Sequence, residues 1–311
     1  MNRTQAAGRP AVVAPIVQPR SGLAHSLDNI RDTFRMLRRN RAGFMGFCLA
    51  VAMIVISFIG PFFVPLDTEN HLDRIYAPPS WDLPLGTDYA GRSVVPLVVH
   101  GGSQAMAVGL LAATISTLIA VVLGAFSAYI GGRTDAIITA VADVFLTLPL
   151  FIVLAVIAAI YKPQSVFFLA VILGLLTWPA LLRAVRAQVL SIKERDYIEA
   201  ARSLGLRPAH IVLNEILPNM AGYIIISFIF SITAAMLLQV NLVALGLVPI
   251  SGNNWAITIY QAAFQKGALY NPNSTGYIMG PVVAIVLFQF ALVTMTRSLE
   301  EIFNPRLRGN L

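Results

Sequence analysis

Six long apolar runs constrain this chain more than any other feature of its sequence. They cover residues 42–66, 103–130, 136–161, 165–182, 220–248 and 277–296, and each is free or nearly free of charge. A helix that crosses a bilayer needs about 20 such residues, and open sheets are excluded there because backbone polar groups must be paired internally. With 57% hydrophobic residues, 12% charged residues and a mean hydropathy of +0.74, the sequence predicts an all-α membrane protein with six transmembrane helices.

The Lys and Arg residues predict how these helices are oriented. Cytosolic flanks of membrane spans carry an excess of both residues, because the side chains resist translocation. Of the 22 Lys and Arg residues, all but Arg74, Arg92, Lys162 and Lys266 fall on the side of the two termini. An even number of spans places both termini on one side. We therefore expect a multi-pass protein with both termini, and residues 183–219, in the cytosol.

Composition divides the rest of the chain into further segments. Residues 1–25 lack any period and predict a disordered cytosolic tail. Residues 26–66 combine a basic amphipathic helix with the first span, and this helix is expected either to lie on the lipid of the inner leaflet or to contact a partner subunit. Residues 103–296 hold the other five spans, and residues 297–311 form a cytosolic C-terminal tail.

Residues 67–102 separate the first two spans and read as an ordered extracytoplasmic loop. Pro78, Pro79 and Pro84 forbid a continuous helix, whereas Gly86 and Gly91 permit tight turns. Acidic residues outnumber basic ones here, which is consistent either with a docking surface for a soluble partner or with topology alone.

Several kinds of chemistry are excluded by missing patterns. Cys48 is the single cysteine, so the chain can form neither an internal disulfide nor a thiolate metal cluster. The four histidines have no zinc-ligand spacing, and no nucleophile elbow occurs. None of the three lysines, Lys162, Lys193 and Lys266, follows a glycine, so a phosphate-binding P-loop is absent. The basic residues are dispersed, which disfavours nucleic acid as a partner. We expect no catalytic residue, no metal site and no cofactor in this chain.

Residues 183–219 are unusual because they carry charges and a central glycine between two apolar spans. Residues 191–204 place Tyr197, Ile198, Ala201 and Leu204 on one helical stripe, which predicts a short helix. Gly205 interrupts it, and a proline three residues later can begin a second helix, since its missing N–H is harmless in a first turn. Such a helix–bend–helix suits a protrusion that enters a groove on another protein, although periodicity alone favours an ordinary interfacial loop.

The letters EAARSLG, from Glu199 to Gly205, are followed downstream by Leu217-Pro218. This pattern resembles the EAA motif of ABC importer permease subunits, with Glu215 at a position that is often Ile. In that family the segment is a coupling helix that sits in a cleft of a cytosolic ATPase. The resemblance implies ATPase-coupling roles for Glu199, Ala200, Ala201, Ser203, Leu204, Gly205, Leu217 and Pro218.

A second set of motifs resembles one branch of this family. The stretch PPSWDLPLGTDYAGRSV is similar to the signature that follows the first span in the C-type permease of dipeptide, oligopeptide and nickel importers. Leu83 stands where His is usual, and Ser93 stands where Asp is usual. The basic lead-in MLRRNRAGFMG, Leu245-Gly246-Leu247 with Trp255, and the ending NPRLR, whose Asn304 replaces a usual Asp, are similar to the same group.

These resemblances imply a fold, a function and partners. The fold expected is the type I (MetI-like) ABC importer permease fold, in a bacterial inner membrane. The function expected is that of the permease subunit of a dipeptide or oligopeptide importer, with nickel or another small solute as the alternative cargo. The partners expected are a second permease subunit, two cytosolic ATPases that use ATP and Mg²⁺, and an extracytoplasmic peptide-binding protein.

Polar residues inside the spans add candidate sites. Asp143 is the one carboxylate within a predicted span, and such charges are costly to bury. We expect this carboxylate to pair with an arginine or to cap a neighbouring helix. The alternative is that it couples protons to transport in a secondary transporter. In the fifth span, Ser227, Ser231, Gln239 and Asn241 are candidates for the translocation path or for interhelical hydrogen bonds. A structural membrane scaffold is a third hypothesis, which the polar fifth span disfavours.

Overall fold

A computed structural model describes residues 40–161, 165–246 and 252–303. The seven long helices within these ranges are α2 (Arg41–Phe58), α4 (Val94–Ile130), α5 (Gly132–Thr147), α6 (Leu150–Tyr161), α7 (Val166–Ile192), α11 (Ala221–Ala244) and α13 (Thr275–Phe303). Shorter helical segments are α3 (Gly60–Phe63), η1 (Leu72–Arg74), α8 (Asp196–Ser203), α9 (Pro208–His210), η2 (Ile211–Ile216), α10 (Leu217–Asn219), α12 (Trp255–Tyr260), η3 (Gln261–Gln265), η4 (Ala268–Tyr270) and η5 (Pro272–Ser274).

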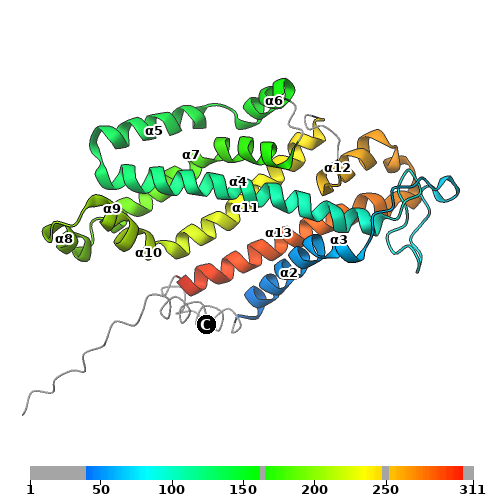
Figure 1. Ribbon diagram of the computed structural model, residues 1–311, viewed down its shortest axis with the longest axis horizontal. Helices are drawn as coiled ribbons and strands as arrows, with labels where there is room; N and C mark the ends of the chain where they lie inside the picture. Colours follow the sequence, from blue (N-terminus) through cyan, green and yellow to red (C-terminus); the bar gives the residue numbers. More distant parts are fainter. Residues whose placement is uncertain (1–39, 162–164, 247–251, 304–311) are drawn as a thin grey trace, which may run out of the picture.

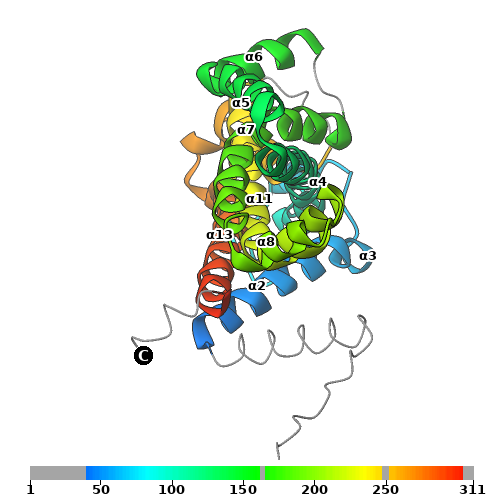
Figure 2. The same ribbon diagram turned by 90° about the vertical axis from the view of Figure 1, so that its left-hand side faces the viewer.

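The molecule is an elongated bundle built along α4 (Figure 1). Residues 64–93, named here the 64–93 loop, lie at one end of the bundle, and residues 193–220, named the 193–220 segment, lie at the other. Viewed from the end that carries α8, the helices α5 and α6 lie on one side and α2 lies on the opposite side (Figure 2). The predicted amphipathic helix before the first span falls outside the described residues.

Five helices are long and apolar enough to cross a membrane, and the pair α5 and α6 would make a sixth span. The prediction of one continuous third span over 136–161 is wrong, because α5 and α6 meet at an angle of 79°. Leu148 has extended backbone angles and Pro149 follows it. The proline ring excludes helical geometry at the residue before it, so the helix ends there.

The boundary between the predicted loop and the second span is also wrong. The helix α4 begins at Val94, so residues 94–102 belong to the helix and not to the loop. Pro96 lies in the first turn, where a missing N–H costs nothing. Gly101 and Gly102 do not break the helix but let Trp255 pack against it, because a Cβ on Gly102 would lie 2.7 Å from Cζ2 of that indole.

Three further boundaries differ from the sequence prediction. The first span, predicted over 42–66, ends as α2 at Phe58, and the short helix α3, with Pro61 in its first turn, follows. The fourth helix continues beyond 182 to Ile192, so residues 191–192 belong to α7 and not to the next helix. The last helix, α13, runs to Phe303, so residues 297–303 are helical and not a separate tail.

Small residues on α4 let its neighbours approach closely. The buried face of α4 consists largely of Ala, Gly, Ser and Thr along its whole length. Facing it, Gly174 of α7 has so little room that a Cβ would lie 2.9 Å from the carbonyl oxygen of Ala112. Apolar attraction is weak between helices in lipid, so such close backbone packing is the main source of association.

The helices α2 and α13 show the same close packing. A Cβ on Gly46 would lie 2.9 Å from the backbone nitrogen of Met295 and 3.0 Å from the carbonyl oxygen of Ala291. Backbone atoms cannot move aside as a flexible side chain can. The glycine therefore fixes the distance between the first and last membrane helices.

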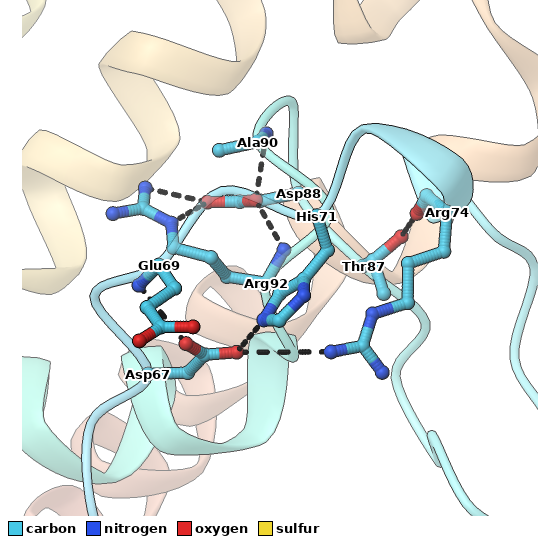
Figure 3. A network of polar contacts seen from close by, with 8 residues as sticks. All are labelled: Asp67, Glu69, His71, Arg74, Thr87, Asp88, Ala90 and Arg92. Atoms are coloured by element: carbon cyan, nitrogen blue, oxygen red, sulfur yellow. Dashed lines mark hydrogen bonds and ion pairs between the residues drawn. The ribbon is translucent and has the colours of Figure 1, made fainter.

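The 64–93 loop is ordered by a buried ion pair (Figure 3). Asp88 is fully buried and accepts hydrogen bonds from the backbone of Ala90 at 2.8 Å and from Nε and Nη2 of Arg92 at 2.9 and 2.6 Å. Burial alone would lower the pKa of Arg92, but its hydrogen bonds with Asp88 raise that pKa above the ordinary value. The guanidinium therefore stays charged. Its ion pair with Asp88 stabilises the turn of residues 88–92, which precedes α4.

Contacts with the other end of the chain hold this loop against the bundle. The hydroxyl of Tyr76 donates to the carbonyl oxygen of Lys266 at 2.5 Å, and Nζ of Lys266 lies 4.1 Å from the ring centre of Tyr89. Gly276, at the start of α13, has no space for a side chain because a Cβ would lie 2.0 Å from the carbonyl oxygen of Leu85.

We predict that Gly46→Ala destabilises the protein by about 2 kcal/mol, since the added methyl group would push α2 away from the backbone of α13. The measurement is the thermal unfolding midpoint of the detergent-solubilised protein. Ala52→Val is the matched control, because Ala52 is an exposed residue of the same helix. Equal midpoints for the two variants would contradict the proposed tight contact.

We predict that Arg92→Gln loosens the 64–93 loop by about 3 kcal/mol, because it leaves the buried carboxylate of Asp88 without a charged partner. Hydrogen exchange of the loop amides measures this effect. The exposed acid Asp82, changed to Asn in the same loop, is the control and should leave exchange unchanged. Unaltered exchange in Arg92→Gln would show that the ion pair does not order the loop.

Candidate functional site

The 193–220 segment folds as a helix, a glycine bend and a second helix, as the sequence predicted. The first helix is α8 (Asp196–Ser203), and Gly205 follows with a φ of +71°. The second begins at Pro208 and continues through α9, the π-helical turn η2 and α10. A π turn inserts an extra residue into a helix and often occurs at functional sites. No pattern in the sequence indicates this π turn.

One face of this segment is buried against the ends of two membrane helices. Ile198, Ile211, Val212 and Ile216 are completely buried, and they pack with Val185 and other residues of α4 and α7. The second helix thus has an apolar face that is buried against the bundle. For the first helix the prediction was partly wrong, because Tyr197 and Leu204 are 42% and 79% exposed and do not share the buried stripe of Ile198 and Ala201. Leu204 is the C-cap residue of α8 and directly precedes the glycine bend.

Two polar contacts add to this anchorage. The guanidinium of Arg202 lies 5.2 Å from the ring centre of Tyr129, near the end of α4. The ammonium group of Lys193 donates to the carbonyl oxygen of Ala128 at 3.2 Å. A cation there also meets the negative end of the α4 dipole. The segment is thus attached to α4 by Lys193, the C-cap residue of α7, and by Arg202 in the last turn of α8.

The outer face of the segment carries most of the residues of the EAA pattern. Glu199, Ala200, Ser203, Leu204 and Gly205 are exposed, whereas the neighbouring Ala201 is buried. A Cβ on Gly205 would meet no atom within 4 Å. This glycine is therefore required by its backbone conformation and not by any contact inside the chain.

The downstream Leu-Pro pair lies at the start of α10. Leu217 is half-buried and packs against the same apolar cluster as Ile216, while Pro218 is exposed and occupies the first turn of the short helix. Together, the buried side chains fix the segment to the bundle and leave one exposed surface that another protein can contact.

The polar residues proposed for the fifth span lie on α11 in different environments. The hydroxyl of Ser231 donates to the carbonyl oxygen of Ser227 at 2.9 Å, an ordinary use of serine in a helix. Gln239 is buried and Asn241 is exposed. The four residues do not form one polar surface, and their roles in the translocation path stay a prediction.

Asp143 pairs with an arginine of the neighbouring helix. Both Nε, at 3.0 Å, and Nη2 of Arg183 on α7 donate to Oδ1 of this carboxylate. A second pair joins the same helices, since Arg186 donates to both oxygens of Asp135 at 2.7 and 2.6 Å. Sequence reasoning missed this second pair. Its signal was the presence of two acids on one helix, Asp135 and Asp143, and of two arginines on the next, Arg183 and Arg186.

Within the described residues, no group of three or more His, Cys, Asp or Glu side chains is arranged to hold a metal ion.

Comparison with known proteins identifies the family. Residues 120–309 match the family described as binding-protein-dependent transport system inner membrane component, and residues 29–79 match the N-terminal TM domain of oligopeptide transport permease C. The dipeptide transport system permease protein DppC of Bacillus subtilis is 30% identical over 292 residues, which cover 91% of this chain and 88% of that protein.

Two oligopeptide permeases show similar relationships. The oligopeptide transport system permease protein OppC of Bacillus subtilis is 27% identical over 91% of this chain and 92% of its own length. OppC of Mycobacterium bovis is 30% identical over 68% of this chain and 74% of its own length. The binding-protein-dependent transport inner membrane components are the non-catalytic, multi-pass permeases of ABC uptake systems. The helical membrane fold and the extent of these matches show that the chain belongs to the binding-protein-dependent transport inner membrane components, and within them to the OppC/DppC type.

Proposed function

We propose that this chain is a permease subunit of an ATP-driven importer of short peptides, and that it forms half of the translocation pore. The observation that carries the proposal is its similarity to dipeptide and oligopeptide permeases over about nine-tenths of its length. Nickel or another small solute remains the alternative cargo within the same family. The family assignment contradicts the hypotheses of a proton-coupled secondary transporter and of a structural scaffold.

The orientation and the partners follow from this function. We place both termini and the 193–220 segment in the cytosol, where two ATPase subunits bind ATP and Mg²⁺. A second permease completes the pore, and an extracytoplasmic binding protein delivers the peptide. The distribution of Lys and Arg supports this orientation.

The packing of the 193–220 segment supports a coupling role. Ile198 and Ile211 are fully buried in a cluster with Val185 and Val189 of α7. A close-packed core transmits displacement instead of absorbing it. When an ATPase moves the exposed side of α8, the buried side would carry α7 and the end of α4 with it. ATP-driven closure of the two ATPases would in this way switch access from one side of the membrane to the other.

The direct test is purification of the tagged chain from its native membrane. We expect ATPase subunits, a second permease and no covalent cofactor in the purified assembly. After reconstitution into liposomes, ATP hydrolysis should rise when a peptide mixture and its binding protein are added. A chain that purifies without an ATPase would contradict the proposed function, whereas an active assembly stimulated by nickel and not by peptides would contradict only the cargo.

We predict that Gly205→Val uncouples transport from ATP hydrolysis while membrane insertion stays normal. A β-branched residue at a φ of +71° is strained by roughly 1–2 kcal/mol, and its side chain would also project toward the ATPase. The measurement is the ratio of peptide uptake to ATP hydrolysis in proteoliposomes.

Gly205→Asn separates these two causes, because Asn tolerates a positive φ yet still adds a side chain. If both variants lose coupling, close approach of the ATPase is the requirement. If Asn restores it, backbone conformation is the requirement. Normal coupling in Gly205→Val would contradict the proposed role of the bend.

A further inference from the structure

The ion pair between Asp143 and Arg183 is far more exposed than an ion pair inside a membrane bundle should be. The side chain of Arg183 is 53% exposed and that of Asp143 is 46% exposed. The pair of Asp135 and Arg186, closer to the turn between α4 and α5, is more protected, with exposed fractions of 14% and 31%. Asp143 lies eight positions further along α5, which is about 12 Å at 1.5 Å per residue.

Most of the exposed residues around this pair are small or polar, with Leu146, which is 37% exposed, as the exception. On α5 they are Ala136, Ala140 and Thr147, all exposed, which lie on the same flank of the helix as Asp143. On α7 the exposed residues on the side of Arg183 are Ala180, Ala187 and Ser191. We name these residues, together with the ion pair, the α5/α7 polar face.

The adjacent flank of α5 has a different composition. Ile137, Val141 and Val144 are exposed there, and all three are bulky and apolar. Bulky apolar side chains are typical of a surface that contacts lipid, where a charged side chain is costly. The polar face therefore contacts water or protein and not lipid.

Among the residues that the structure describes, the ion pair is incompletely satisfied. Both hydrogen bonds from Arg183 go to Oδ1 of Asp143, and no hydrogen bond to the second oxygen occurs within the described residues. Between the two ion pairs, the hydroxyl of Thr139 is buried and has no partner among the described residues. Water, or the ammonium end of a solute, would complete the exposed carboxylate of Asp143.

We propose that the α5/α7 polar face lines the hydrated translocation path, and that Asp143 and Arg183 form a weak transit site for the charged termini of a short peptide. The inference rests on the proposed function. A free peptide carries an ammonium group at one end and a carboxylate at the other, and this pair offers a partner for each. Exposure keeps the interaction weak, as release from a path requires.

The first test measures whether water reaches the face. In the full assembly with Cys48 replaced by Ser, we would introduce Ala140→Cys, Ala180→Cys or Val141→Cys and add a water-soluble cationic thiosulfonate reagent. Val141 is the matched control, because it neighbours Ala140 at the same depth but lies on the apolar flank. We expect Ala140→Cys and Ala180→Cys to be modified at least about tenfold faster than Val141→Cys, since a thiol in apolar surroundings forms less thiolate. Added trialanine should slow the modification of Ala140→Cys and Ala180→Cys.

The second test measures recognition of the peptide termini. The double variant Asp143→Asn with Arg183→Gln is compared with Asp135→Asn with Arg186→Gln. We expect the preference for uptake of free trialanine over acetylated, amidated trialanine to fall about threefold in the first double variant and to stay unchanged in the second. A purely structural role would reduce uptake of both peptides equally.

The outcomes distinguish this inference from the proposed function. If the unaltered assembly hydrolyses ATP without importing trialanine, the proposed peptide function fails. If it imports trialanine but the Ala140→Cys and Ala180→Cys variants react as slowly as Val141→Cys, the polar face contacts lipid or the second permease, and the transit site is refuted.

Discussion

Close packing along α4 is the contact on which the rest of this structure depends. Its 37 residues extend to about 55 Å, which exceeds the hydrocarbon thickness of a bilayer. One helix therefore reaches both ends of the bundle. Because its buried face consists largely of small residues, α2, α7 and α11 all pack against it. Lipid offers little apolar driving force between helices, so this shape match replaces the hydrophobic effect that organises a soluble core.

The length of α4 joins the two ends of the molecule. At its start, Val94 and Leu97 are buried with Tyr277 and hold the 64–93 loop against α13. At its other end, Ala125 and Ala128 are buried with residues of the 193–220 segment. A displacement applied at one end thus acts on a continuous, close-packed helix and not on a flexible linker. This geometry suits a transporter that must relate binding on one side of the membrane to ATP use on the other.

Much of this architecture could be predicted from sequence because lipid imposes simple rules. Long uncharged runs predicted the spans, and the glycine followed by a proline predicted the bend and the second helix after α8. The errors have two causes. Gly101 and Gly102 were assigned to the loop, but they lie in α4 and seat Trp255, a residue more than 150 positions away. The third span was predicted as continuous, but Pro149 ends α5 locally, and a single sequence does not say that the bend reaches 79°.

The same limit applies to the charged residues. Sequence showed that Asp143 was unusual and that an arginine was a suitable partner, but not how much of the pair remains exposed. That property depends on which flank of α5 meets α7, and helical periodicity alone does not fix it. With both helices in place, bulky residues lie on one flank and small or charged residues lie on the other. A chain in lipid has little reason to maintain such an asymmetry unless two different media meet its surface. The half-exposed ion pair thus indicates where lipid ends.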